Sequence, residues 1–141
     1  SISFEGDSGP YLQYTAVRAN SVLEKAKAAG LDLIENNFWQ KLFSFGVKNK
    51  KVQRPNDFEI LDLEKYLYRF QEVVERAGRE YAPHYIVTYL TELAAAFNNF
   101  YAKEKILDDK NSDYKIALTF ATYNVLKNGL NLLGIKVPEK M

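Results

Sequence analysis

Apolar residues recur every three or four positions along most of this chain, and this spacing is the feature that most restricts its fold. The first such segment opens at Gly9 and Pro10 and runs to about Ala29, where Gly30 supplies a natural stop. Its core face would comprise Leu12, Ala16, Ala19 and Leu23. Alternating apolar and polar residues, as in a half-buried strand, extend over no more than a few positions. The sequence therefore predicts an all-α helical bundle.

Three further segments carry the same spacing. The residues that would begin them are Asn56 with Glu59 as a capping box, Pro83, and Ser112 or Asp113. Gly134 would end the last helix, because glycine readily adopts the left-handed conformation that follows a helix. The apolar faces would comprise Ile60, Leu63, Leu67 and Phe70; Ile86, Leu90, Leu93, Phe97 and Phe100; and Ile116, Phe120, Tyr123, Leu130 and Leu133.

Residues 31–56 are the least regular part of the chain. Their aromatic and apolar residues could form a short buried helix, and these are Phe38, Trp39, Leu42, Phe43 and Phe45. A basic run then ends at Pro55 and indicates an exposed loop; it contains Lys48, Lys50, Lys51 and Arg54.

The charge balance limits the kinds of partner. Nineteen Lys and Arg residues and 18 Asp and Glu residues give a formal net charge of +1, so bulk charge does not make this chain a polyanion binder. A contact with nucleic acid must therefore be local and shaped. The sequence has no cysteine, which excludes disulfides and cysteine-based zinc sites and fits a cytoplasmic protein. No apolar run reaches the roughly 20 residues of a membrane span, so we expect no membrane partner.

Residues for catalysis are scarce. His84 is the only histidine, and it falls in the first turn of an expected helix, where a structural or solvent-exposed role is commoner than a catalytic one. The glycine-rich patterns of phosphate-binding loops are absent from the sequence. We therefore expect no catalytic residue, no metal site and no cofactor in this chain.

A stripe of two tyrosines and an arginine is the most informative feature outside the core pattern. Tyr11, Tyr14 and Arg18 are spaced i, i+3 and i+7, so a helix places them together beside its core face. Two aromatic rings and a guanidinium can stack on unpaired bases and hydrogen-bond to them. By pattern alone, the same stripe could equally pack on a neighbouring domain.

Three separated segments carry a resemblance to a known family. Residues 3–14, SFEGDSGPYLQY, followed by Arg18, closely resemble a signature of arginyl-tRNA synthetases, where the string joins the catalytic domain to the helical anticodon-binding (DALR) domain. Residues 82–101 resemble that domain's central helix, and residues 128–141 resemble its last helix and tail. Since the three segments occur in the right order, the resemblance covers nearly the whole chain.

The resemblance implies a fold, a domain and a parent enzyme. The fold would be the helical bundle of the class I synthetase anticodon-binding type, occupying residues 1–141, with residues 1–10 as the end of the link from a catalytic domain. Because the chain opens at Ser1 rather than Met, we expect it to be part of a longer protein. That protein would join arginine to its tRNA, using ATP and Mg²⁺ in its catalytic domain, and this chain alone would be non-catalytic.

The resemblance also implies partners and site residues. The partners would be the anticodon loop of an arginine tRNA and the enzyme's own catalytic domain, in a monomeric cytoplasmic protein. In the family, the tyrosines and arginine of the signature and the terminal methionine lie at the anticodon site. They correspond to Tyr11, Tyr14, Arg18 and Met141, and Phe97 and Tyr101 are additional candidates from the central helix. The competing interpretations are a protein-interaction module and an enzyme in its own right.

Overall fold

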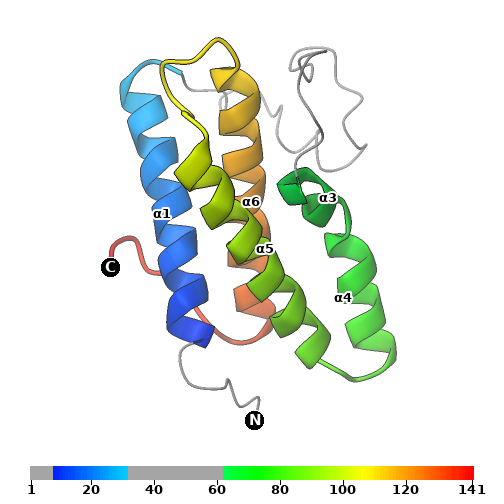
Figure 1. The fold of residues 1–141 in the computed structure, drawn as a ribbon. Helices are drawn as coiled ribbons and strands as arrows, with labels where there is room; N and C mark the ends of the chain where they lie inside the picture. The colour runs from blue at the N-terminus through cyan, green and yellow to red at the C-terminus, as the bar shows by residue number, and fades with distance from the viewer. Residues whose placement is uncertain (1–7, 32–61) are drawn as a thin grey trace.

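The computed structural model describes residues 8–31 and 62–141, and across these two ranges its secondary-structure elements are all helices. The helices are α1 (Ser8–Ala28), α3 (Asp62–Tyr68), α4 (Phe70–Arg79), α5 (His84–Lys103) and α6 (Ser112–Leu132). In Figure 1, α1 and α5 run in the same direction, α6 runs antiparallel behind them, and α3 and α4 flank α5. The predicted all-α bundle is confirmed.

Helix α1 forms as its periodicity predicts. The expected core residues Leu12, Ala16 and Ala19 have no exposed surface, and Leu23 is buried as well. The helix ends because Gly30 adopts a φ of +81°, which lets the backbone N–H of the next residue, Leu31, donate to the carbonyl of Ala26 at 2.9 Å. The first turn starts at Ser8, so the end of the expected link from residue 8 to residue 10 is already helical.

The second predicted helix is two helices. The backbone breaks between α3 and α4 at Arg69, whose N–H donates to the carbonyl of Tyr66 at 3.1 Å, three residues back rather than four. Leu63 is buried as expected, whereas Leu67 and Phe70 are only partly buried against the core. The expected apolar face is thus shared between two short elements instead of forming one continuous stripe.

Helix α5 is the central element, and it begins after Pro83 as predicted. All five residues of its expected apolar face are buried: Ile86, Leu90, Leu93, Phe97 and Phe100. Its approach to α6 depends on Gly129, because a Cβ atom there would lie 2.8 Å from both terminal carbons of Leu90. A glycine inside a helix is therefore explained by close packing between two helices.

Helix α6 ends as predicted but does not begin as predicted. Gly134 has a φ of +80°, and the following N–H, of Ile135, donates to the carbonyl of Leu130 at 2.9 Å. Neither Ser112 nor Asp113 caps the start, because the residue before the helix is Asn111 and no side chain caps it. Of the expected inward residues, Ile116 and Leu130 are buried, whereas Phe120, Tyr123 and Leu133 are partly buried.

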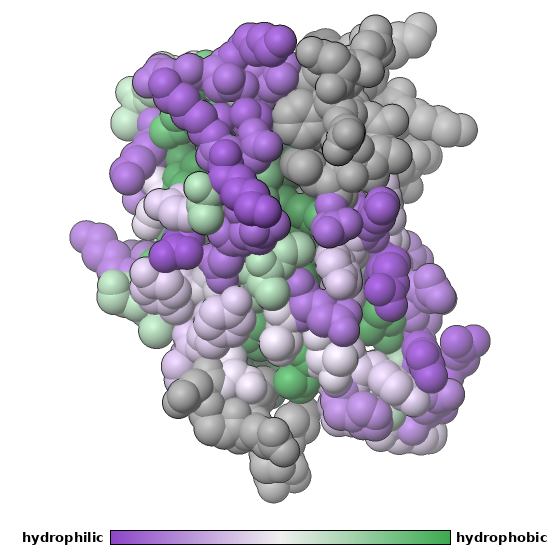
Figure 2. Space-filling view, in the orientation of Figure 1, coloured by the Kyte–Doolittle hydropathy of each residue, from purple (hydrophilic) through white to green (hydrophobic). Residues whose placement is uncertain are grey.

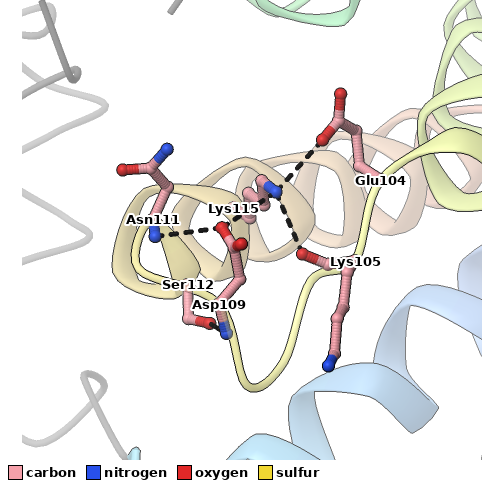
Figure 3. A network of polar contacts seen from close by, with 6 residues as sticks. All are labelled: Glu104, Lys105, Asp109, Asn111, Ser112 and Lys115. Carbon is pink, nitrogen blue, oxygen red and sulfur yellow. Dashed lines mark hydrogen bonds and ion pairs between the residues drawn. The ribbon is translucent and has the colours of Figure 1, made fainter.

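A buried lysine secures the turn that leads from α5 to α6 (Figure 3). The Lys115 side chain is 5% exposed, and its Nζ atom lies 3.0 Å from a carboxylate oxygen of Glu104 and 3.0 Å from one of Asp109. It also donates to the backbone carbonyl of Lys105 at 3.0 Å. The second role of Asp109 is to accept the backbone N–H of Asn111 at 3.0 Å. One cation thus joins both ends of the turn to the first turn of α6.

Several sequence expectations lie outside the described residues. These are the capping box of Asn56 and Glu59, Ile60, the apolar segment from Phe38 to Phe45, and the basic run from Lys48 to Arg54. Within the part of the chain that the structure describes, no helix is long and apolar enough to cross a membrane.

Candidate nucleic-acid interface

The predicted stripe on α1 is half-exposed. Tyr11 is 38% exposed and Tyr14 is 48% exposed, although neighbouring positions on the same helix are fully buried. Figure 2 shows the face formed by α1 and α5, where weakly polar side chains, coloured pale, gather over the lower part of α1, and strongly hydrophilic ones lie above them. The stripe therefore leaves aromatic surface available to a ligand.

Arg18 joins this stripe to α5. Its Nη2 atom donates to the phenolic oxygen of Tyr14 at 3.2 Å, and its guanidinium carbon lies 5.1 Å from the centre of the Tyr14 ring. The same carbon lies 4.6 Å from the centre of the Tyr101 ring on α5. Both distances fall within the range of cation–π attraction. Tyr101 is 40% exposed, so the structure brings Tyr14, Arg18 and Tyr101 into one surface cluster.

Asn98 is a member of the site that the sequence pattern did not single out. Its Oδ1 atom accepts from Nη1 of Arg18 at 2.9 Å. Its Nδ2 atom donates to the phenolic oxygen of Tyr11 at 3.1 Å and to the hydroxyl of Thr15 at 3.1 Å. The available signal was its position three residues before Tyr101, which puts both on one side of α5. We name the surface formed by Tyr11, Tyr14, Arg18, Asn98 and Tyr101 the aromatic–arginine surface.

Phe97 does not belong to this surface. It has no exposed area, so it cannot stack on a base, and its selection as a contact residue is corrected to a core role. Its ring centre lies 6.3 Å from that of Tyr101 and 6.1 Å from that of Phe100. Phe97 therefore supports Tyr101 from below, because it fills the core beneath the exposed ring.

The C-terminal tail returns to α1. Gln13, which lies between the two tyrosines of the stripe, donates from Nε2 to the backbone carbonyl of Lys136 at 2.8 Å. Ile135 and Val137 pack against the core on alternate positions, as in an extended segment with one side inward. In Figure 1 the tail passes α1 and ends beside it, and the side chain of Met141 is 61% exposed. The structure thus brings the start of the tail to the helix that carries the stripe.

His84 lies apart from the aromatic–arginine surface. It is exposed in the first turn of α5, and its ring centre lies 4.4 Å from that of Tyr85. Among the described residues, no group of three or more His, Asp or Glu side chains is arranged to hold a metal ion. The chemistry that the aromatic–arginine surface offers is binding through ring faces, hydroxyl groups and a guanidinium.

An all-helical bundle with a half-exposed surface of aromatic rings and a guanidinium fits the class of helical anticodon-binding domains. The chain belongs to the DALR anticodon binding domain family, whose profile matches residues 12–141.

Similar proteins agree with this family. An arginine–tRNA ligase of Thermococcus kodakarensis is 39% identical over 142 residues, which cover 99% of this chain and 21% of that protein. One from Streptococcus suis is 41% identical over 146 residues, covering 99% of this chain and 22% of that protein. The solved arginyl-tRNA synthetase of Thermus thermophilus superposes with a TM-score of 0.66 at 29% identity, over 99% of this chain and 22% of that one. The chain thus spans about a fifth of the length of the relatives it matches.

Proposed function

We propose that this chain is the anticodon-binding domain of an arginine–tRNA ligase, and that its aromatic–arginine surface binds the anticodon loop of an arginine tRNA. The observation that carries the proposal is the convergence of side chains from α1 and α5, far apart in sequence, on one half-exposed surface. Tyr14, Arg18 and Tyr101 meet there within cation–π distance.

The surface suits unpaired bases better than a duplex. Tyr11, Tyr14 and Tyr101 expose part of their rings, and single-stranded loops offer splayed bases that stack on such rings. Arg18 is the one formal charge of the cluster, and the whole chain carries a net charge of +1. Recognition should therefore depend on stacking and on hydrogen bonds to bases more than on attraction to phosphates.

We assign Met141 to the same site through the tail. The hydrogen bond from Gln13 to the Lys136 carbonyl holds the start of the tail against α1, at the helical turn that carries Tyr11 and Tyr14 but on a different face. A thioether side chain adapts to irregular apolar space, so Met141 can supply an apolar contact to a base. The tail would then close one side of the base-binding surface.

The aminoacylation reaction belongs to the longer enzyme in this proposal. ATP and Mg²⁺ would bind a catalytic domain outside this chain, which would also be the partner that the chain contacts within the enzyme. The enzyme would be monomeric and cytoplasmic. The isolated chain should show no arginine-dependent exchange of ATP with pyrophosphate, because it contains none of the glycine-rich phosphate-binding patterns.

The test is binding of a fluorescent anticodon stem-loop of an arginine tRNA to the chain. Tyr14→Ala should weaken binding about 5- to 150-fold, since stacking on one aromatic ring contributes about 1–3 kcal/mol. Tyr81→Ala is the matched control, because Tyr81 is 94% exposed at the turn between α4 and α5. Equal affinities of the two variants, or equal binding of an unrelated stem-loop, would refute the proposed site.

A second experiment addresses the tail. Removing Lys140 and Met141 should weaken stem-loop binding while the melting temperature stays within about 2 °C, because both residues are exposed and termini contribute little packing. Unchanged affinity would exclude the tail from the site. A fall in melting temperature in step with affinity would make the tail a structural clasp instead.

A further inference from the structure

Among the described residues, Asn98 is the only member of the aromatic–arginine surface whose side chain hydrogen-bonds to both ends of the α1 stripe. It contacts Arg18 at one end through Oδ1 and Tyr11 at the other through Nδ2. Because it lies on α5, it also fixes the stripe relative to the second helix of the surface. Its side chain therefore determines more of the site's hydrogen bonding than any residue of the stripe.

The orientation of the Asn98 amide follows from its partners. A guanidinium has five N–H donors and no acceptor, so the atom of Asn98 that faces Arg18 must be the carbonyl oxygen. The amide nitrogen is then directed to Tyr11 and Thr15, and both of their hydroxyl oxygens must accept. Thr15 can do so because its own hydrogen is donated to the backbone carbonyl of Tyr11 at 2.9 Å.

This arrangement sets the direction of both phenolic hydroxyls. The oxygen of Tyr11 accepts from Asn98, and the oxygen of Tyr14 accepts from Arg18 at 3.2 Å. A phenol has one hydrogen to donate, so in each case that hydrogen is left for a partner outside the cluster. The solvent-facing side of the surface thus offers two phenolic donors and the remaining N–H groups of the guanidinium, and few acceptors.

We propose that Asn98 is a positioning residue that makes Tyr11 and Tyr14 outward hydrogen-bond donors, so that the surface selects acceptor atoms of the bound RNA. This inference rests on the proposed function of the surface. The acceptors can belong to a base edge, such as a ring nitrogen or a carbonyl oxygen, or to a phosphate oxygen. Asn98 itself touches no RNA in this proposal and acts through Tyr11 and Arg18.

The decisive variant is Asn98→Asp, which has almost the same shape. A carboxylate still accepts from Arg18, but it cannot donate to Tyr11. The phenolic hydrogen of Tyr11 then turns inward to the carboxylate, and the side chain presents an acceptor to the ligand. Asn99→Asp is the matched control for the added charge, because Asn99 is the next residue of α5 and is exposed.

The experiment is a double-mutant cycle on stem-loop affinity. Tyr11→Phe should weaken binding about two- to tenfold in the unmodified chain and in Asn99→Asp, because one donated hydrogen bond is lost. It should have no effect in Asn98→Asp, where that donor has already turned inward. A merely structural asparagine would give additive effects, so the coupling itself is the diagnostic quantity.

Further variants keep the outcome interpretable. Should Asn98→Asp fail to melt cooperatively, Asn98→Ala replaces it, and the effect of Tyr11→Phe should again shrink because the hydroxyl is no longer oriented. Stem-loops with 7-deazapurines lack the N7 acceptor of the purine edge, and those with methylphosphonates lack one non-bridging phosphate oxygen and its charge. The substitution that abolishes the Tyr11→Phe effect in the unmodified chain identifies which acceptor Tyr11 contacts.

The results distinguish failure of the role of Asn98 from failure of the proposed function. An equal effect of Tyr11→Phe in all backgrounds overturns the role of Asn98, and it leaves the proposed function standing if Tyr14→Ala still weakens binding. Failure of the unmodified chain to bind the stem-loop overturns both proposals.

Discussion

Replacing Lys115 by methionine tests how the turn between α5 and α6 is stabilised. Methionine keeps the apolar stem but removes the ammonium group, which contacts Glu104, Asp109 and the Lys105 carbonyl at 3.0 Å each. Because the lysine side chain is only 5% exposed, its charge is desolvated and its contacts are not interchangeable with water. The two carboxylates and the carbonyl then lose a common partner.

The expected cost follows from the exposure of the partners. Removing one member of a fully buried ion pair costs about 3–5 kcal/mol. Here Glu104 is 32% exposed and Asp109 is 28% exposed, so both can regain part of their hydration when the lysine is lost. We therefore expect a loss of about 2–3 kcal/mol in unfolding free energy, which for a chain of this size lowers the melting temperature by about 8–12 °C.

Chemical denaturation monitored by circular dichroism measures this loss, with Lys65→Met as the control. Lys65 pairs with Asp62 at 4.0 Å, but the two side chains are 65% and 84% exposed, so its loss should cost less than about 0.5 kcal/mol. Equal effects of the two substitutions would refute the buried-cation explanation. Adding Glu104→Gln and Asp109→Asn to Lys115→Met should recover stability, because no unpaired charge then remains.

Acid titration adds an independent check on the same cluster. The backbone N–H of Asn111, and then the side chain of Lys115, lower the pKa of Asp109 below its ordinary value of 3.8. A carboxyl whose pKa is lowered by folding contributes stability that is present above the unfolded pKa and lost as the pH falls through the folded one. The unmodified chain should therefore lose this contribution below about pH 4, and Lys115→Met should lose less of it. An identical acid dependence of both proteins would exclude the coupling.

Three backbone positions give further predictions, each measured as a change in unfolding free energy. Gly129→Ala should destabilise the fold by about 1 kcal/mol, because overpacking against Leu90 exceeds the gain in helix propensity. Gly78→Ala should stabilise it by about 0.5–1 kcal/mol, because a Cβ atom there would have no atom within 4 Å. If both substitutions changed the unfolding free energy in the same direction, the packing argument would be refuted. Tyr81→Gly should stabilise by about 1 kcal/mol, because Tyr81 has a φ of +51° and packs on nothing; a loss of stability would show that its ring is needed.

The periodicity of apolar residues predicted the helices that bury one continuous face. It did not predict helix breaks and helix starts that depend on single hydrogen bonds. The core faces of α1 and α5 follow from spacing because each buries one continuous stripe. The break at Arg69 and the uncapped start of α6 at Ser112 do not follow from spacing, because they depend on local hydrogen bonds. Asp109 accepts the N–H of Asn111, the residue before the helix, and its spacing from the helix did not reveal this role.

The same distinction applies to the candidate site. Tyr11, Tyr14 and Arg18 could be grouped from sequence because one helix carries them. Phe97 and Tyr101 lie one turn apart on α5, yet one is fully buried and the other is 40% exposed. The apolar spacing within α5 already predicted the burial of Phe97, and only the family resemblance had added it to the contact residues. Asn98 was missed because its partners lie more than 80 residues away on α1, where no spacing within α5 could reveal them.

Buried core residues directly contact the side chains of the candidate site. Thr15 is fully buried, yet it donates to the carbonyl of Tyr11 and accepts from Asn98. Phe97 is fully buried directly before Asn98 in the chain, and it lies beneath Tyr101. The orientations of the exposed tyrosines are therefore fixed by the close-packed interior rather than by the ligand. A surface arranged in this way loses little conformational freedom on binding, so more of the stacking energy appears as affinity. Substitutions that loosen the packing between α1 and α5 should consequently weaken stem-loop binding even when they lie beneath the surface and touch no RNA.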